Sequence, residues 1–197
     1  AQEYFGVRAD MALFSKAVAN GMPLAILTGR ADIMALLDKD VFFFTTFGGE
    51  ALSLAGAKAT IEYMQKNDVQ RVIAEKGKRL REGYNKIASS LGMTYTSCSG
   101  FDCRTIMTFD ASAGNPLEMK SLVQQEMIKR GVLWGGFHNV SFSLTEDDID
   151  HILASYAEVL PILKNAVETG NVRELLRGEP VSPVFRKTSN FNMKPKH

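Results

Sequence analysis

Two long helical patterns in the middle of the chain limit the folds that this sequence can adopt. Between residues 51 and 91, apolar side chains recur every three or four positions, which is the spacing of one face of an α-helix. The first pattern ends near Asn67, and the second ends at Gly92, a residue type that readily closes a helix. The first pattern is rich in small residues, which permit close approach of that helix to a sheet. These small residues are Ala51, Ala55, Gly56, Ala57 and Ala59.

Strand-like segments are expected on both sides of these helices. Before them, residues 11–14 and 22–28 are apolar runs bounded by turn residues. They are followed by a short helical pattern at residues 31–38. After the long helices, residues 93–110 alternate and predict two strands joined at Ser99-Gly100. This mixture of strands and helices predicts an α/β fold.

The last third of the chain predicts two more helices. Pro116 suits the first turn of a helix that runs to Arg130. Residues 145–148 form a capping box, which predicts the start of a further helix. Two short strand candidates lie between these helices, at residues 131–134 and 140–144.

The pattern divides the chain into three parts. Residues 173–197 contain six basic side chains, two acidic ones and three prolines, which is typical of a tail on the surface. The pattern also changes from helical to alternating just after Gly92. We therefore expect one part at residues 1–92, a compact α/β part at 93–168 and a basic tail at 169–197.

Composition excludes several classes of function. The 197 residues carry 23 Lys and Arg against 22 Asp and Glu, so the chain lacks the basic excess of a nucleic-acid-binding protein. No apolar run approaches the roughly 20 residues that span a bilayer, and no signal peptide opens the chain. Two cysteines, Cys98 and Cys103, are too few for a disulfide framework or a zinc site. We expect a cytoplasmic protein without a metal, a nucleic-acid partner or a membrane span.

Lys16 is the candidate catalytic residue. It lies between two apolar strand-like runs and precedes a loop of small residues, Ala17–Gly21. We expect such a lysine to be held at a sheet edge with its amine withdrawn from water. Desolvation favours the neutral amine, which is what a Schiff-base lysine needs to act as a nucleophile and proton carrier. Taken alone, the spacing also allows an ordinary solvated loop lysine.

Three segments of the chain together resemble a known family. Residues 14–24, followed by Gly29-Arg30, are similar to the lysine segment of class III pyridoxal-phosphate aminotransferases, above all their glutamate-1-semialdehyde aminomutase-like branch. Residues 45–57 and 143–150 resemble two later segments of the family, in the same order. The resemblance covers residues 1 to about 168. It implies a fold type I transferase, with 1–92 as the C-terminal part of the large cofactor-binding domain and 93–168 as the small C-terminal domain.

The resemblance also implies roles for two residues. Lys16 would form the Schiff base with pyridoxal 5′-phosphate and act as the general base of the 1,3-proton shift. Thr46 would bind the cofactor phosphate, in this family usually across the dimer interface, so a homodimer with shared active sites is expected. Without the resemblance, Thr46 reads equally as a strand threonine packed on its sheet.

The chain also departs from the family pattern, and three roles stay open. Glu50-Ala51 stands where many members have Asn-Pro, so Glu50 either meets a substrate amine or favours the dipole of the following helix. Leu144 stands where a histidine is common. Arg104 either binds a substrate carboxylate or pairs on the surface. His138 lies in a loop near the expected substrate entrance or is bound to the backbone.

Several family elements have no counterpart here. The aspartate that pairs with the pyridine nitrogen, the glycine-rich phosphate loop and the ring-stacking aromatic precede the lysine segment in the family. The chain starts at Ala1, which removal of an initiator methionine would also explain. We expect that the N-terminal half of the same protein is missing and that this piece alone is inactive.

The predicted function is amino-group transfer between a small-molecule amino donor and a keto or aldehyde acceptor. The donor would be an amino acid, an amine or an amino-aldehyde. Two alternatives remain open: an intramolecular aminomutase of the glutamate-1-semialdehyde type, and a non-catalytic dimerisation or scaffold fragment.

Overall fold

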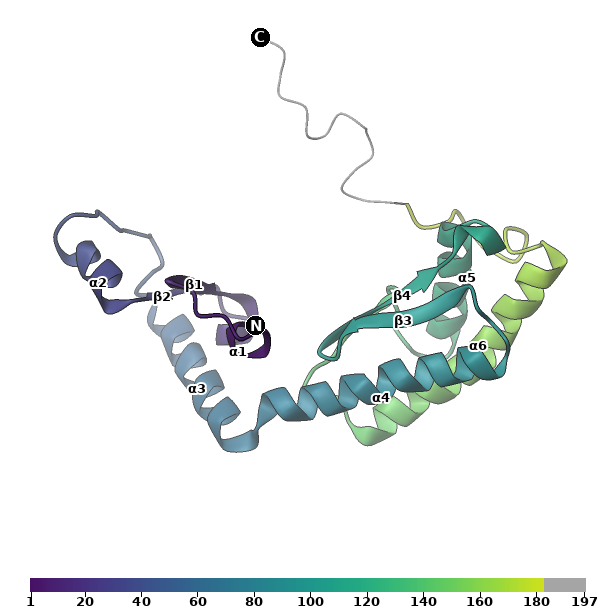
Figure 1. Ribbon diagram of the computed structural model, residues 1–197, viewed down its shortest axis with the longest axis horizontal. Helices are drawn as coiled ribbons and strands as arrows, with labels where there is room; N and C mark the ends of the chain where they lie inside the picture. Colours follow the sequence, from purple (N-terminus) through teal and green to yellow (C-terminus); the bar gives the residue numbers. More distant parts are fainter. Residues whose placement is uncertain (183–197) are drawn as a thin grey trace, which may run out of the picture. The chain divides into compact units, whose positions relative to one another are not determined.

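The computed structural model describes residues 1–182, and residues 183–197 of the predicted basic tail lie outside the described part. The chain forms two compact units, which divide between Val69 and Gln70 (Figure 1). The expected border lay at residue 92. The helix before that border joins the second unit because its side chains Leu80 and Tyr84 are buried there. The assignment of 1–92 and 93–168 to a large and a small domain of a longer protein stays a prediction.

The first unit combines short elements with one long helix. Its two strands form an antiparallel sheet in which Met11 pairs with Gly29 and Phe14 pairs with Ile26. The elements are α1 (Gln2–Phe5), β1 (Met11–Phe14), the 3₁₀ helix η1 (Lys16–Ala19), β2 (Ile26–Gly29), α2 (Ala31–Met34), the 3₁₀ helix η2 (Ala35–Asp38) and α3 (Ala51–Asn67). The predicted short helix at 31–38 is confirmed as α2 followed by η2.

The second strand is shorter than predicted. The sequence indicated residues 22–28, whereas β2 begins at Ile26. Residues before it form a turn, in which the N–H of Met22 donates to the carbonyl of Ala19 and the N–H of Leu24 donates to that of Met22. Pro23 lies inside this turn and has no N–H to give to a sheet.

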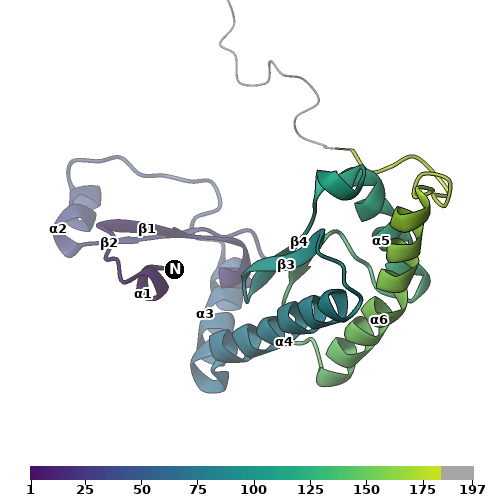
Figure 2. The same cartoon turned by 45° about the vertical axis from the view of Figure 1, so that its right-hand side comes forward.

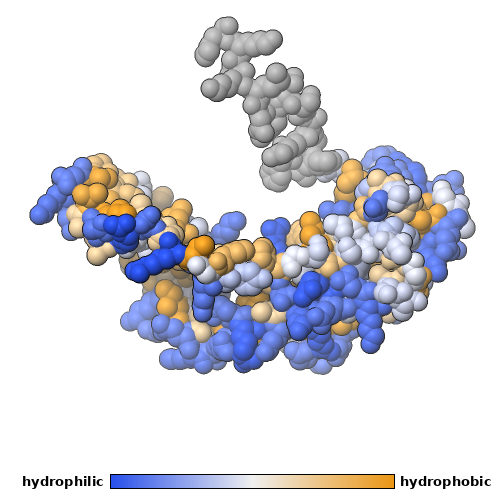
Figure 3. Space-filling view, in the orientation of Figure 1, coloured by the Kyte–Doolittle hydropathy of each residue, from blue (hydrophilic) through white to orange (hydrophobic). Residues whose placement is uncertain are grey.

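The first unit buries little apolar surface of its own. Among its described residues, most large apolar side chains are exposed, and they appear as orange patches on the left of Figure 3. The small residues of α3 pack against η1, where Ala19 and Ala57 are buried. Small residues permit close approach of any backbone, and within residues 1–69 this face of α3 packs on the 3₁₀ helix η1. A close approach of α3 to a sheet stays a prediction.

The second unit is a three-stranded sheet with helices on one face. The strand order is β3-β4-β5, and both pairings are antiparallel. Buried and exposed residues alternate along β3 and β4, and helices pack on the buried face (Figure 2). The elements are α4 (Val69–Ser90), β3 (Thr96–Phe101), β4 (Arg104–Phe109), the 3₁₀ helix η3 (Ala111–Ala113), α5 (Pro116–Lys129), β5 (Phe137–Asn139) and α6 (Glu146–Thr169).

Helix boundaries in this unit follow the predicted signals. Thr145 and Asp148 form the capping box that opens α6, and Pro116 is the first residue of α5. Gly92 follows α4 with φ +69°, a left-handed conformation that suits glycine. One core joins the sheet to all three helices through Tyr84 of α4, Leu122 of α5 and other buried side chains.

The strands differ from prediction at three places. The β3–β4 connection lies at Asp102-Cys103 and not at Ser99-Gly100, because Gly100 stays in the strand and pairs with Thr105. Residues 131–134 form no strand, since the N–H of Val132 bonds back to Met127 in α5. The candidate at 140–144 also forms none, and β5 precedes it.

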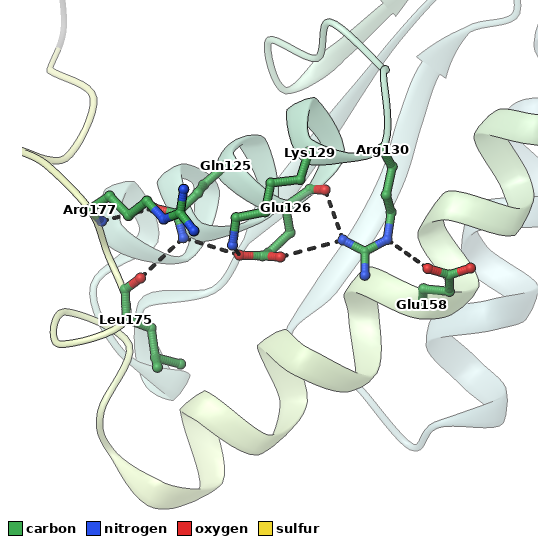
Figure 4. Close-up of polar contacts among 7 residues, drawn as sticks. All are labelled: Gln125, Glu126, Lys129, Arg130, Glu158, Leu175 and Arg177. Carbon is green, nitrogen blue, oxygen red and sulfur yellow. Dashed lines mark hydrogen bonds and ion pairs between the residues drawn. The ribbon is translucent and has the colours of Figure 1, made fainter.

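The segment after α6 lies along α5. The Gln125 side chain holds it at two points: its Nε2 donates to the carbonyl of Leu175 at 3.1 Å, and its Oε1 accepts from the N–H of Arg177 at 2.8 Å (Figure 4). Further along α5, Arg130 donates to Glu158 of α6 at 2.8 Å. These polar contacts hold the segment after α6 against α5, and they hold the end of α5 against α6.

Residues 1–182 contain neither a membrane-spanning helix nor a cluster of metal-binding side chains. No helix there is long and apolar enough to cross a membrane. No group of three or more histidine, cysteine, aspartate or glutamate side chains there could hold a metal ion.

Candidate active site

Lys16 occupies a strained backbone position just after a strand. Strand β1 ends at Phe14, Ser15 caps the following turn, and Lys16 is its first residue. The φ angle of Lys16 is +55°, in the left-handed region that residues other than glycine rarely adopt. A conformation of this kind costs about 1–3 kcal/mol and persists only where the surroundings enforce it, most often at functional sites.

The turn that carries Lys16 is closed by its own hydrogen bonds. The N–H of Val18 donates to the carbonyl of Ser15 at 3.4 Å, and the N–H of Asn20 donates to that of Ala17 at 3.2 Å. Asn20 is itself left-handed, with φ +46°. The two left-handed positions, Lys16 and Asn20, are separated by only three residues, so the backbone of Lys16 has little freedom.

The Lys16 side chain is exposed in this chain. Its neighbours in β1 are open as well, with Leu13 70% and Phe14 47% exposed. The expected withdrawal of the amine from water is therefore not found within residues 1–69. The physical reason is that a two-stranded sheet this short leaves the side chains at its end uncovered.

Thr46 lies in a turn, not in a strand. Residues 41–45 have no regular structure, so the interpretation of Thr46 as a strand threonine is wrong. The turn is closed by the N–H of Gly48, which donates to the carbonyl of Thr45 at 3.4 Å. A Cβ atom on Gly48 would lie 2.4 Å from Thr45 Oγ1, so a side chain at this position would require the Thr45 hydroxyl to turn away. The Thr46 side chain is exposed.

The Thr46 turn borders an open pocket of the first unit. The pocket has a volume of about 660 Å³ and is lined mainly by apolar side chains, among them Leu13, Ile26 and Phe47. Thr46 lines this pocket and Lys16 does not. Within one copy of the chain, the structure thus brings Thr46 to the β1–β2 sheet without placing it in the same pocket as Lys16.

Glu50 caps the helix that follows the Thr46 turn. Its Oε1 accepts from the N–H of Leu52 at 2.8 Å, and its Oε2 accepts from the N–H of Ser53 at 2.7 Å. Bonding to Ser53, followed by that to Leu52, holds the pKa of the Glu50 carboxyl below its usual range. Of its two open roles, the structure bears out the one at the helix end.

Arg104 and His138 lie in the second unit, in different surroundings. Arg104 is exposed on β4, with its guanidinium carbon 5.3 Å from the centre of the Phe137 ring. His138 is buried in β5, not in a loop, between Thr105 at 2.7 Å and Tyr156 at 2.8 Å. Burial lowers the pKa of His138 to about 4. Both histidine nitrogens are bonded to side chains, so His138 is a core residue.

Sequence reasoning missed the residues on which the Lys16 turn rests. The helix face that packs against η1 consists of Ser53, Gly56 and Ala57. Their small size was visible in the sequence, but its meaning depends on which backbone lies opposite. The left-handed angle of Lys16 gave no signal in the sequence at all, because lysine has no preference for it.

Known proteins resemble this chain over a region that includes both the Lys16 and the Thr46 turns. The family model of class-III aminotransferases matches residues 1–151. A glutamate-1-semialdehyde 2,1-aminomutase from Halorubrum lacusprofundi is 27% identical over 198 residues, which cover 81% of this chain and 44% of that protein. A 3-aminobutyryl-CoA aminotransferase from Cloacimonas acidaminovorans is 26% identical over 167 residues, covering 83% and 40%.

The fold is also that of solved transaminases. The FumI protein from a Sphingopyxis species, whose structure contains pyridoxal phosphate as the internal aldimine, matches with a TM-score of 0.74 at 20% identity. The match covers 85% of this chain and 40% of that one. The chain thus spans 40–44% of the length of these relatives. The predicted fold type I architecture is confirmed, and the chain belongs to the class III aminotransferase family, whose members use pyridoxal phosphate.

Proposed function

We propose that this chain is the C-terminal part of a pyridoxal-phosphate-dependent class III transaminase, with Lys16 as the residue that binds the cofactor covalently. The observation that carries the proposal is the left-handed backbone of Lys16 at the end of β1, inside the matched family segment. Strain at this lysine has no packing benefit of its own, because the side chain is exposed. It is explained if the turn serves to aim the amine.

The residues present fit the chemistry of such a cofactor. The Lys16 amine would condense with the aldehyde carbon of the cofactor and release water, and once free again it would remove the proton from the substrate carbon that bears nitrogen, as the general base of the 1,3-proton shift. When bound, the cofactor supplies an electron-withdrawing ring that weakens bonds at the substrate carbon bearing nitrogen. The Thr46 hydroxyl would donate a hydrogen bond to its phosphate.

Glu50 limits how the phosphate can be held. Its carboxylate already accepts from the N–H groups of Leu52 and Ser53, and it brings a negative charge to the start of α3. An anion would meet filled donors and repulsion there. The exposed hydroxyl of Thr46, before the helix, is a donor that this turn offers to a phosphate.

A second copy of the chain would complete the site. Lys16 and Thr46 do not line one pocket within a copy, which supports a homodimer in which Thr46 of one copy serves Lys16 of the other. Exposed aromatic side chains beside the Thr46 turn support the same arrangement, since apolar surface of this kind is normally covered. They are Phe42, Phe43, Phe44 and Phe47.

The rest of a longer protein would supply what this chain lacks. Water has to be excluded from the Lys16 amine, and a carboxylate has to keep the pyridine nitrogen protonated. We expect both from the portion that the relatives have beyond the matched 40–44% of their length. Its substrates would be a small amino donor and a keto or aldehyde acceptor. A cytoplasmic location stays a prediction from composition.

The test uses the protein that carries this chain. Incubation with pyridoxal phosphate followed by borohydride should leave the phosphopyridoxyl group on the peptide that contains Lys16. Lys16→Ala should abolish both this adduct and the visible absorbance of the protonated Schiff base. Lys39→Ala, which removes another exposed lysine of the same unit, should change neither. An adduct that persists in Lys16→Ala would refute the assignment.

An aminomutase is the second candidate. It is favoured by the likeness to the glutamate-1-semialdehyde 2,1-aminomutase from Halorubrum lacusprofundi. A transaminase consumes a keto or aldehyde acceptor in equal amount to the amino donor, whereas an aminomutase converts one amino-aldehyde without any acceptor. A Lys16 adduct that forms in a protein with neither activity would favour the scaffold alternative.

A further inference from the structure

We propose that Gly56 of α3 is a positioning residue for Lys16. In this proposal, the missing side chain at position 56 lets the 3₁₀ helix η1 settle against α3, and this contact holds Lys16 in its left-handed backbone. The proposal rests on the proposed function of Lys16 for its catalytic meaning. Its structural claim, that Gly56 controls the presentation of the Lys16 amine, can be tested separately.

The contact between η1 and α3 is the best-buried part of the first unit. Ala19 at the end of η1 is buried, and so are Ser53 and Ala57 on the facing side of α3. Residues 53, 56 and 57 share one face of the helix because they are three and four positions apart. Around this contact the apolar side chains of the unit are largely exposed. The position of η1 therefore depends on how closely it can approach this face.

Gly56 lies where the approach is closest. A Cβ atom at this position would lie 3.2 Å from Met22 Cγ and 3.4 Å from the carbonyl oxygen of Ala19. The same carbonyl accepts a hydrogen bond from the N–H of Met22 at 3.2 Å. A single methyl group could be met by a small shift of the flexible Met22 side chain. A larger side chain would press on the Ala19 backbone.

A displacement of Ala19 would reach Lys16 through a short, stiff segment. The two residues are the ends of the four-residue helix η1. Hydrogen bonds from Val18 to Ser15 and from Asn20 to Ala17 link its successive positions. Lys16 is held at φ +55°, which lysine does not prefer. Loss of the contact between η1 and α3 would therefore let its backbone relax and move the amine.

Helix propensity argues that Gly56 is kept for this contact. It lies inside the 17-residue helix α3, where glycine costs about 1 kcal/mol relative to alanine. Thr60 adds no requirement for glycine, since its hydroxyl bonds to the Gly56 carbonyl, which every residue has. If Gly56 had no role in placing η1, alanine would be the better residue for the helix.

The experiment compares Gly56→Ala and Gly56→Val with a matched control, Ala55→Val, which adds a β-branched side chain to the exposed side of the same helix. The protein that carries this chain is used without cofactor. The rate at which an amine-specific reagent labels Lys16 is measured by peptide mass spectrometry, with Lys39 as the internal reference. The thermal unfolding midpoint is measured in parallel, and the cofactor-loaded protein is titrated by its visible absorbance.

We expect Gly56→Val to change the labelling rate of Lys16 relative to Lys39 by at least about twofold, with a shifted absorbance titration, while Ala55→Val changes neither. Gly56→Ala should keep or raise the unfolding midpoint and change the Lys16 rate less than Gly56→Val does, because its methyl group meets mainly the flexible Met22 side chain. If Gly56→Val fails to fold, Gly56→Ser takes its place. A native Lys16 rate in the folded protein with the larger side chain would overturn the proposal.

Failure of the proposed function gives a different result. A native protein that forms no Lys16 adduct with pyridoxal phosphate refutes the cofactor role, whatever the labelling rates are. If the native protein forms the adduct and the Gly56 variants label like the native protein, only the positioning role of Gly56 is refuted.

Discussion

The side-chain amide of Asn85 binds both backbone polar groups of Cys98. Its Nδ2 donates to the Cys98 carbonyl and its Oδ1 accepts from the Cys98 N–H, each at 2.8 Å. Among residues 1–182, strand β3, which contains Cys98, pairs with β4 and with no other strand. A side chain from α4 thus does at the free edge of the sheet what a neighbouring strand would do.

Replacing Asn85 should weaken the second unit and expose this edge. Asn85→Ala leaves one donor and one acceptor of Cys98 unpaired, for which we expect a loss of about 1–3 kcal/mol in the free energy of unfolding. Asn85→Asp keeps the acceptor for the Cys98 N–H and should lose less. Urea unfolding followed by Trp134 fluorescence checks this, because Trp134 is the only tryptophan of the chain and is buried in this unit. Equal stability of Asn85→Ala and native chain would contradict the expectation.

His138 should make the second unit sensitive to mild acid. The Trp134 indole donates to the Tyr156 oxygen, and His138 is hydrogen-bonded through Nε2 to the same oxygen and through Nδ1 to the Thr105 hydroxyl. Burial of the imidazole disfavours its protonated form and lowers the pKa of His138 to about 4 in the folded state.

The direction of the pH effect follows from this pKa. Unfolded histidine titrates near 6.5, so unfolding takes up a proton between pH 6.5 and about 4. The contribution of neutral His138 to the free energy of unfolding is fully present above pH 6.5. It should decrease by up to about 1.4 kcal/mol per pH unit as the pH falls toward 4. His138→Gln cannot titrate, and its unfolding free energy should depend less steeply on pH in this window. Parallel pH profiles of the two proteins would show that other groups cause the loss.

Gly77 should tolerate no side chain where α4 meets the β3–β4 turn. A Cβ atom at this position would lie 1.6 Å from the carbonyl oxygen of Asp102, which is backbone and cannot turn aside. We expect Gly77→Ala to cost about 1–3 kcal/mol despite the better helix propensity of alanine. Gly83 on the same helix is the matched control, because there the obstacle is the flexible Leu153 side chain. Both can be measured by urea unfolding, and a larger loss for Gly83→Ala would contradict the prediction.

Gln125 should control access to the segment after α6. Gln125→Ala removes the bonds to Leu175 and Arg177, so this segment should leave α5 more often. Limited digestion with trypsin should then cleave after Arg173 or Arg177 faster than in the native chain. Gln124→Ala, which changes the neighbouring residue of α5, should cleave at the native rate. A native rate in Gln125→Ala would mean that the segment is held by other contacts.

The sequence was most informative where one residue decides the local structure. The capping box of Thr145 and Asp148, Pro116 at the start of α5 and the left-handed Gly92 all depend on local chemistry, and the structure confirms them. The class III family was also recognisable from three short segments, and the family model bears it out.

Prediction failed where a residue type serves two structures. Gly100 suggested a turn, yet it lies in β3 with φ +101° and the turn follows two residues later. The small residues of α3 permitted a close neighbour without naming it, and within residues 1–69 that neighbour is η1. The expected burial of Lys16 failed for a different reason, because burial depends on surface that residues 1–69 do not provide.

The two cysteines differ in a way that has a practical use. Cys98 is buried, and burial raises the pKa of its thiol, whereas Cys103 is exposed in the β3–β4 turn. A maleimide dye should therefore attach to the native protein at one point of this chain without any cysteine being removed. With a second dye placed on the N-terminal unit, energy transfer would measure the distance between the two dyes in solution.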